Sequence, residues 1–155
     1  MRVDSAKRGR TLNNSVNQIL KRYVQWDMFE SQAGMIPFAK PVVSELLANM
    51  SKEEIASLAK NVAKNTVLDS MMVMRGKIDL NSFLSWFENL MEKASIDINH
   101  IVENSGSTHK YIVKHNLGEN WAFLIESLLQ TIFNDTLGIR ITIMNLSNTT
   151  LMLQI

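Results

Sequence analysis

The stretch "IDINHIVENSGSTHKYIVKHN", residues 96–116, decides the fold class. Two short segments rich in β-branched and aromatic residues flank the letters NSGS (104–107), a composition typical of a tight turn. The stretch therefore predicts a β-hairpin. If the turn pairs its first residue with its last, His100 faces Tyr111, and His109 lies on the same side of the hairpin.

The residues after the hairpin extend this prediction. Apolar residues recur at steps of three and four over about 118–136, which predicts a helix, and two further short strands follow at the end of the chain. Residues 96–155 thus predict a ββαββ unit, a four-stranded sheet with one helix across it. Such a unit leaves its other sheet face open unless the helices of residues 41–94, or a second copy of the chain, cover it.

The residues before the hairpin read as helices. Ser51-Lys52-Glu53-Glu54 is a capping box, and Pro37 and Pro41 mark a connector ahead of it. The patterns predict helices over about 11–31, 41–49, 52–75 and 80–94. The expected fold class is therefore α+β, with a basic helical segment over residues 1–34 and an α+β domain over residues 35–155.

Composition excludes several classes of protein. The 155 residues include no Cys, which removes disulfides, thiolate metal sites and Cys nucleophiles. No apolar run approaches the 18 or so residues that span a bilayer. The glycine-rich nucleotide loops, HExxH and GxSxG are all absent. We therefore expect a cytoplasmic, non-enzymatic protein with no catalytic residues and no membrane contact.

Positive charge is concentrated at the start of the chain. The net charge is +1, yet residues 1–25 contain six Lys or Arg and one Asp, so the remainder carries −4. A basic end on an acidic body favours contact with a polyanion. The alternative is a solvated terminus.

The letters AKRGRTLNNSVNQILKRYV (6–24) resemble the second helix, with the turn before it, of ribbon-helix-helix DNA-binding proteins. The family pattern is a Gly, a Ser or Thr cap, and an apolar helix ending in Arg or Lys and an aromatic residue; it is matched by Gly9, Thr11, Val16, Ile19, Leu20 and Tyr23. The resemblance implies a dimer on duplex DNA, with the helix N-terminus on a backbone phosphate.

The likeness is partial. Only eight residues precede Gly9, too few for the family's DNA-reading ribbon, so the ribbon either lies upstream of Met1 or has been lost. No base-reading residue is therefore carried over. The expected phosphate contacts, from the resemblance and from charge, are Arg2, Lys7, Arg8, Arg10, Thr11 and Asn13. Without DNA, the apolar stripe of this helix would dock on the body of the protein or on a second subunit.

Three histidines, His100, His109 and His115, fall on one predicted face of the hairpin. His115 lies four residues along from the position of His100, roughly 13 Å at about 3.3 Å per residue, so one ion cannot bind all three. His100 and His109 could share an ion as diagonal neighbours, but no Asp or Glu lies on that face of the hairpin. We expect no stoichiometric metal, no cofactor, and a half-buried histidine bonded to Tyr111 or to backbone.

The letters HNLGENW (115–121) form the junction between the hairpin and the next helix. Gly118 permits a tight turn there. Two alternatives stay open: a plain junction anchored by Trp121, or a pocket for an unknown small molecule, lined by His115, Glu119 and Trp121.

The C-terminal half, especially HKYIVKHNLGENWAFLIESLLQTIF (109–133), resembles uncharacterised archaeal regulator-type proteins that join such a helix pair to an α/β domain. The resulting hypothesis is a homodimeric, DNA-associated transcriptional regulator with a dimerising or ligand-sensing C-terminal domain. The alternative is a protein–protein interaction module that does not bind DNA.

Overall fold

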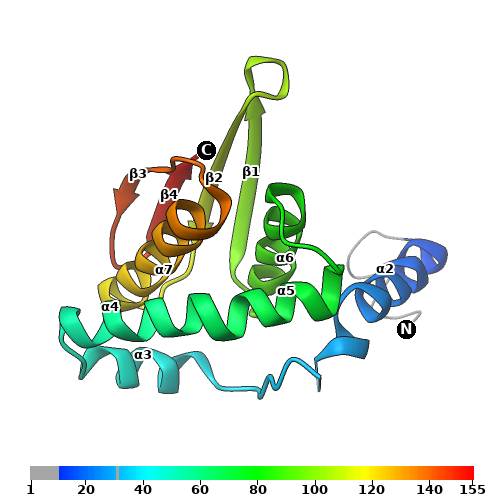
Figure 1. Cartoon of the computed structure of the whole chain (residues 1–155). Coiled ribbons are helices and arrows are strands. Elements are labelled where there is room, and N and C mark those ends of the chain that lie inside the picture. Colours follow the sequence, from blue (N-terminus) through cyan, green and yellow to red (C-terminus); the bar gives the residue numbers. More distant parts are fainter. Residues whose placement is uncertain (1–10, 31) are drawn as a thin grey trace. The chain divides into compact units, whose positions relative to one another are not determined.

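The computed structural model describes residues 11–30 and 32–155. The chain forms two compact units, and the boundary between them falls between Ile36 and Pro37. Helices and one four-stranded antiparallel sheet make up the described residues, so the predicted α+β class is confirmed (Figure 1). The cationic residues Arg2, Lys7, Arg8 and Arg10 lie outside the described residues.

The first unit contains helix α2, Leu12–Gln25. Its predicted cap is confirmed, because Thr11 Oγ1 accepts a hydrogen bond from the backbone N–H of Asn14 at 3.3 Å. The prediction that the helix extends to about residue 31 is wrong. Trp26 leaves the helical region with φ −143°, and its side chain is buried, so a short 3₁₀ turn, Asp27–Phe29, follows instead.

Four α-helices of the second unit precede the sheet, and their ends follow local capping chemistry. Ser51 and Glu54 form the predicted capping box, with reciprocal bonds of 3.2 and 2.8 Å. Asp79 caps the last of the four through a 2.8 Å bond from the N–H of Ser82. The helices are α3 (Lys40–Ala48), α4 (Lys52–Asn61), α5 (Leu68–Arg75) and α6 (Leu80–Lys93).

The predicted single helix over 52–75 is interrupted by a π-helical segment, Val62–Val67, between α4 and α5. Buried residues recur every four positions through it: Ile55, Ala59, Ala63, Val67 and Met71. Four residues of an α-helix turn through about 400°, so this pattern drifts by about 40° at each step. The i→i+5 bonds of a π turn fit more residues into each turn and take up the drift, which keeps the buried face on one side.

The sheet has strand order β1-β2-β4-β3, and every neighbouring pair is antiparallel. Between β2 and β3 the chain forms helix α7, Glu119–Thr131, continued by a second π-helical segment, Ile132–Leu137. The predicted hairpin register is confirmed, because His100 faces Tyr111 across the β1–β2 pair. The strands are β1 (Asp97–Glu103), β2 (Thr108–Lys114), β3 (Thr142–Leu146) and β4 (Thr150–Gln154).

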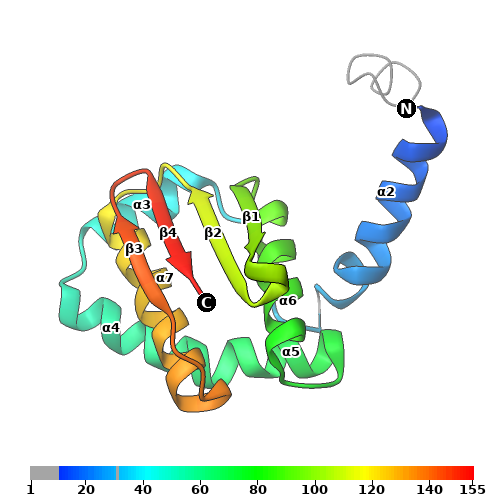
Figure 2. The same ribbon diagram turned by 90° about the horizontal axis from the view of Figure 1, so that it is seen from above.

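One face of the sheet forms the core of the second unit. Its central side chains, from Tyr111, Val113, Leu151 and Leu153, are buried. The views in Figures 1 and 2 place α7 and the helices of residues 40–93 together on one side of the sheet. The sequence allowed these helices to cover the second face of the sheet, but they do not. Figure 2 shows that face open.

Candidate functional site

The hairpin brings two of the three histidines together on the helix-facing side of the sheet. His100 lies on β1, directly opposite Tyr111 on β2. His109 lies on β2 two residues before Tyr111, which makes it the diagonal neighbour of His100. His100 Nε2 and His109 Nδ1 are 2.8 Å apart, a hydrogen-bond distance, and the two rings lie 5.0 Å apart between centroids. The expected diagonal pair is therefore present.

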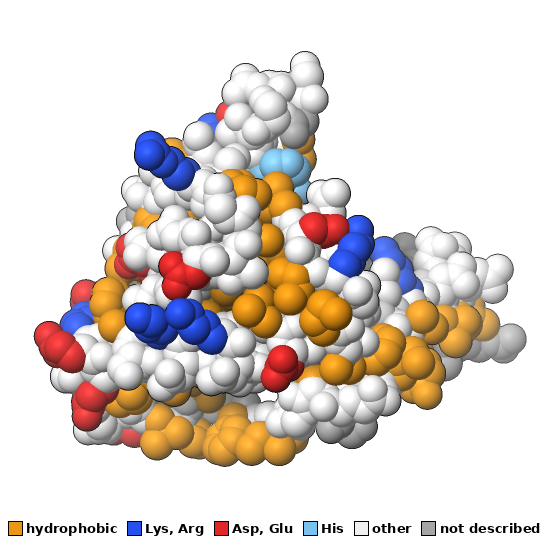
Figure 3. Space-filling view, in the orientation of Figure 1, with side chains coloured by type: hydrophobic (Ala, Val, Ile, Leu, Met, Phe, Trp, Pro, Cys, Tyr) orange, Lys and Arg blue, Asp and Glu red, His pale blue; other side chains and the backbone are white. Residues whose placement is uncertain are grey.

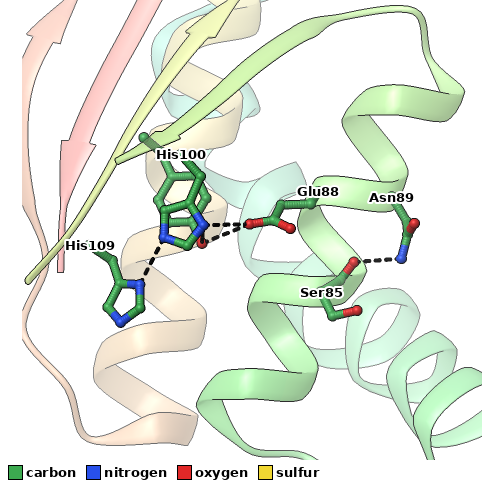
Figure 4. Close-up of polar contacts among 6 residues, drawn as sticks. Ser85, Glu88, Asn89, His100 and His109 are labelled. Atoms are coloured by element: carbon green, nitrogen blue, oxygen red, sulfur yellow. Dashed lines mark hydrogen bonds and ion pairs between the residues drawn. The ribbon is translucent and has the colours of Figure 1, made fainter. Parts of the chain in front are cut away.

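A carboxylate from α6 completes the cluster. Oε1 of Glu88 lies 3.0 Å from His100 Nδ1 and 3.0 Å from the hydroxyl oxygen of Tyr111. Figure 4 shows Glu88 pointing from its helix towards His100, with His109 on the far side of the ring. The side chains of His100 and Glu88 remain 28% and 36% exposed, so water reaches the cluster.

For two neutral imidazole rings, the hydrogen bonds fix the tautomers. A carboxylate only accepts, so His100 donates its Nδ1–H to Glu88, and Nε2 of the neutral ring becomes an acceptor. His109 then donates Nδ1–H to that nitrogen, and its own Nε2 keeps a lone pair. The result is a directed chain of hydrogen bonds, in which His109 donates to His100 and His100 donates to Glu88.

Tyr111 holds the inner end of the chain in place. Burial raises the pKa of its phenol, and the charge of Glu88 and the hydrogen bond to it raise the pKa further. The hydroxyl therefore remains a donor to Glu88. Its ring stacks on His100 with centroids 4.2 Å apart and an angle of 14° between the planes, which limits rotation of the imidazole.

The residues of the predicted junction pocket separate into two environments. His115 and Trp121 are buried and stack with centroids 4.5 Å apart, and His115 Nδ1 accepts the N–H of Leu117 at 3.0 Å. Glu119 is exposed and forms an ion pair with Lys52 at 3.4 Å. The structure therefore brings two of the three residues together and directs the third to solvent.

Burial lowers the pKa of His115, and the backbone of Ser147 only partly opposes this shift. A folded-state pKa below the unfolded value of 6.5 means that the unfolded chain binds more protons. The contribution of His115 to folding stability is fully present above pH 6.5 and is lost as the pH falls from 6.5 through the lower folded-state pKa. We predict that the free energy of unfolding falls between pH 7 and pH 5, by up to about 1.4 kcal/mol per pH unit.

Urea unfolding at a series of pH values measures this dependence. His115→Gln should flatten the slope between pH 7 and pH 5, although it lowers stability overall. His109→Gln, on the partly exposed cluster, is the matched control and should leave the contribution of His115 in place. An unchanged slope in His115→Gln would show that other groups govern the pH dependence.

The predicted phosphate contacts lie at the start of α2. Thr11 is occupied as the helix cap, and Asn13 is exposed in the first turn. No acidic residue lies in that turn, so the positive end of the helix dipole is not neutralised there. The other four expected contacts, Arg2, Lys7, Arg8 and Arg10, lie outside the described residues.

Comparison with known proteins adds no identification. No family model, curated protein or solved structure matches the chain. Among residues 11–30 and 32–155, no three His, Cys, Asp or Glu side chains converge to hold a metal ion. No helix in this described part is long and apolar enough to cross a membrane.

Sequence reasoning missed Glu88, although a signal for it exists. Glu88 lies one turn after the buried residue Leu84 and three residues before the buried Met91, at the edge of the apolar stripe of α6. An acidic residue in such a position needs a polar partner. The hydroxyl of Tyr111, on the buried face of the hairpin, also needs a polar partner. It donates a hydrogen bond to the carboxylate of Glu88, which gives both groups a partner.

Proposed function

We propose that the protein is a non-enzymatic, DNA-associated regulator that acts as a homodimer through α2. The observation that carries the proposal is the exposed apolar stripe of this helix. Within α2 no residue is buried; Leu12, Ile19, Leu20, Tyr23 and Val24 are between 40% and 59% exposed, and Val16 is half-buried. The stripe comprises Leu12, Val16, Ile19, Leu20, Tyr23 and Val24.

A second copy of α2 is the occupant that this stripe fits. Positions 12, 16, 19 and 23 follow steps of four, three and four, the spacing with which two helices interlock side chains. A helix of 14 residues is marginal by itself in water and gains most of its stability from packing. The resemblance to ribbon-helix-helix proteins implies the same arrangement.

Dimerisation through α2 would place two basic N-terminal segments in one assembly. Each begins with four cations, Arg2, Lys7, Arg8 and Arg10, next to a helix N-terminus that lacks acidic residues. Phosphate is the ligand that this combination of charge and backbone N–H groups favours. In the same proposal, the ββαββ unit of residues 96–155 supplies the ligand-sensing part.

Fluorescence anisotropy with a labelled duplex tests the proposal. We expect measurable binding at about 20 mM salt and its loss near physiological salt. Each phosphate contact contributes a slope of about −0.9 in log K against log salt, and a dimer that uses about four to eight contacts would give a steep dependence. Little sequence preference is expected, because phosphate contacts carry no base information.

Replacing Arg2, Lys7, Arg8 and Arg10 together with Ser should abolish the binding and leave the fold intact. The matched control removes four exposed cations from the second unit and changes the net charge equally: Lys60, Lys64, Lys114 and Arg140 to Ser. Equal loss in both variants would indicate an unspecific effect of net charge. Absence of duplex binding at about 20 mM salt would contradict the proposal.

The interaction-module alternative is favoured by a second apolar surface. On α3 and the residue pair before it, the side chains of Phe38, Val42 and Leu46 are 57%, 45% and 60% exposed at four-residue spacing. Figure 3 shows hydrophobic side chains gathered along this helix. A dimer that fails to bind duplex DNA would make protein–protein interaction the better-supported function.

A further inference from the structure

We propose that His100 and His109 form an exposed, two-imidazole site for a divalent transition metal, with preference for Cu²⁺. The inference rests on the hairpin cluster alone and is independent of the proposed DNA binding. Imidazole nitrogens are good ligands for copper, zinc and nickel. The two that face each other here come from neighbouring, paired strands of the β1–β2 hairpin.

The two nitrogens already lie at a distance that adjacent metal ligands can adopt. Two adjacent ligands about 2.0 Å from a square-planar or tetragonal ion are separated by about 2.8 Å, whereas tetrahedral ligands at that distance are separated by about 3.3 Å. His100 Nε2 and His109 Nδ1 are 2.8 Å apart. This separation, which the hydrogen bond sets in the metal-free protein, is compatible with adjacent ligands of a tetragonal ion, and the intrinsic affinity order of divalent ions favours Cu²⁺ over Zn²⁺.

The neighbours of His100 prepare it to coordinate. Metal-binding histidines commonly donate their second ring N–H to a carboxylate, which sets the tautomer and raises the basicity of the ligating nitrogen. Glu88 provides that carboxylate at 3.0 Å from Nδ1, and its negative charge partly compensates an incoming cation. The stacked ring of Tyr111 keeps the imidazole plane fixed.

Coordination requires only a proton rearrangement within the neutral cluster. His109 moves its proton from Nδ1 to Nε2, which frees the lone pair of Nδ1 for the metal, while His100 keeps Nδ1–H on Glu88. No net proton is released from the neutral pair, and one is released from the singly protonated pair. Binding should therefore weaken as the cluster becomes protonated.

Two protein ligands imply an exchangeable site. Water would complete the coordination, because no third His, Asp or Glu converges on the pair among the described residues. Such a site should lose its ion during purification, in agreement with the expectation that no stoichiometric zinc or nickel is retained. The proposal therefore concerns binding of added metal.

The experiment is a Cu²⁺ titration of the untagged 155-residue chain near pH 7, followed by calorimetry and by electron paramagnetic resonance. We expect one saturable equivalent with a tetragonal spectrum split by two coordinated nitrogens. Zn²⁺ added in the same way should bind at least about tenfold more weakly.

Variants separate ligands from positioning residues. His100→Gln and His109→Gln should each remove the saturable equivalent, and Glu88→Ala, which affects only orientation and charge, should weaken it by about 10- to 100-fold. Lys110→Gln is the matched control, because Lys110 follows His109 in sequence but pairs with Glu103 at 2.7 Å on the opposite face. Circular dichroism confirms that each variant is folded.

The outcomes decide the proposal. Loss of the copper equivalent in both histidine variants, with Lys110→Gln unaffected, supports the site. An equivalent that persists in His109→Gln, or a spectrum with a single coordinated nitrogen, overturns it.

Discussion

Replacing Leu20 with Asp should convert the proposed dimer to a monomer of 17.6 kDa. The Leu20 side chain is 56% exposed on the apolar stripe of α2 and would be covered by a second copy in the proposed dimer. Burial of a Leu side chain contributes about 1.5–3 kcal/mol, and a two-fold dimer contains the change twice. The dissociation constant of the dimer should therefore rise by at least about 100-fold.

Light scattering coupled to size-exclusion chromatography measures the change over a wide range of protein concentration. Asn14→Asp is the matched control, because it adds the same charge to the polar face of the same helix and should leave the dimer intact. A wild-type protein that is monomeric at every concentration would contradict the proposed dimer. A Leu20→Asp variant that remains dimeric would instead place the interface outside α2.

Truncating Phe83 should produce the largest loss of stability among the substitutions considered. Its side chain is 1% exposed and touches three aromatic rings, with centroid distances of 5.9 Å to Trp86, 6.0 Å to Phe87 and 5.2 Å to Phe133. Phe→Ala in such a site costs about 3–5 kcal/mol, from lost burial and from the cavity that remains. The total stability of a domain is only about 5–15 kcal/mol.

Urea unfolding gives the loss as a shift of the transition midpoint. Phe38→Ala removes the same atoms from a side chain that is 57% exposed, so its effect should stay within about 0.5 kcal/mol. Phe83→Leu keeps most of the buried volume and should fall between the two. Equal effects at Phe83 and Phe38 would show that the aromatic cluster does not anchor α6.

Local interactions made much of the fold predictable. The caps at Thr11 and Ser51 depend on hydrogen bonds between residues three apart, so neighbouring letters are enough to place them. The hairpin register follows from its turn and from strict alternation, because a slip of one residue would turn Tyr111 to the opposite face. The pairing of His100 with His109 was predictable for the same reason.

Long-range packing determined what the sequence pattern could not. The helix α2 ends at Gln25, immediately before the buried Trp26, and the π-helical segment Val62–Val67 keeps a four-residue repeat facing one side. Neither has a simple local signal, because residue burial is not a property of neighbouring letters in the sequence. The sequence pattern predicted a helix in each region, but it did not predict the end of α2 at Gln25 or the π-helical segment between α4 and α5.

The candidate site shows the same division. The sequence alone determined that two histidines would meet on one face of a hairpin, since strand periodicity and turn length are local properties. Only the tertiary structure decided that Glu88 would reach His100, because the two residues lie on separate elements whose packing depends on the whole core. That contact orients the imidazole and converts a pair of histidines into a preorganised cluster.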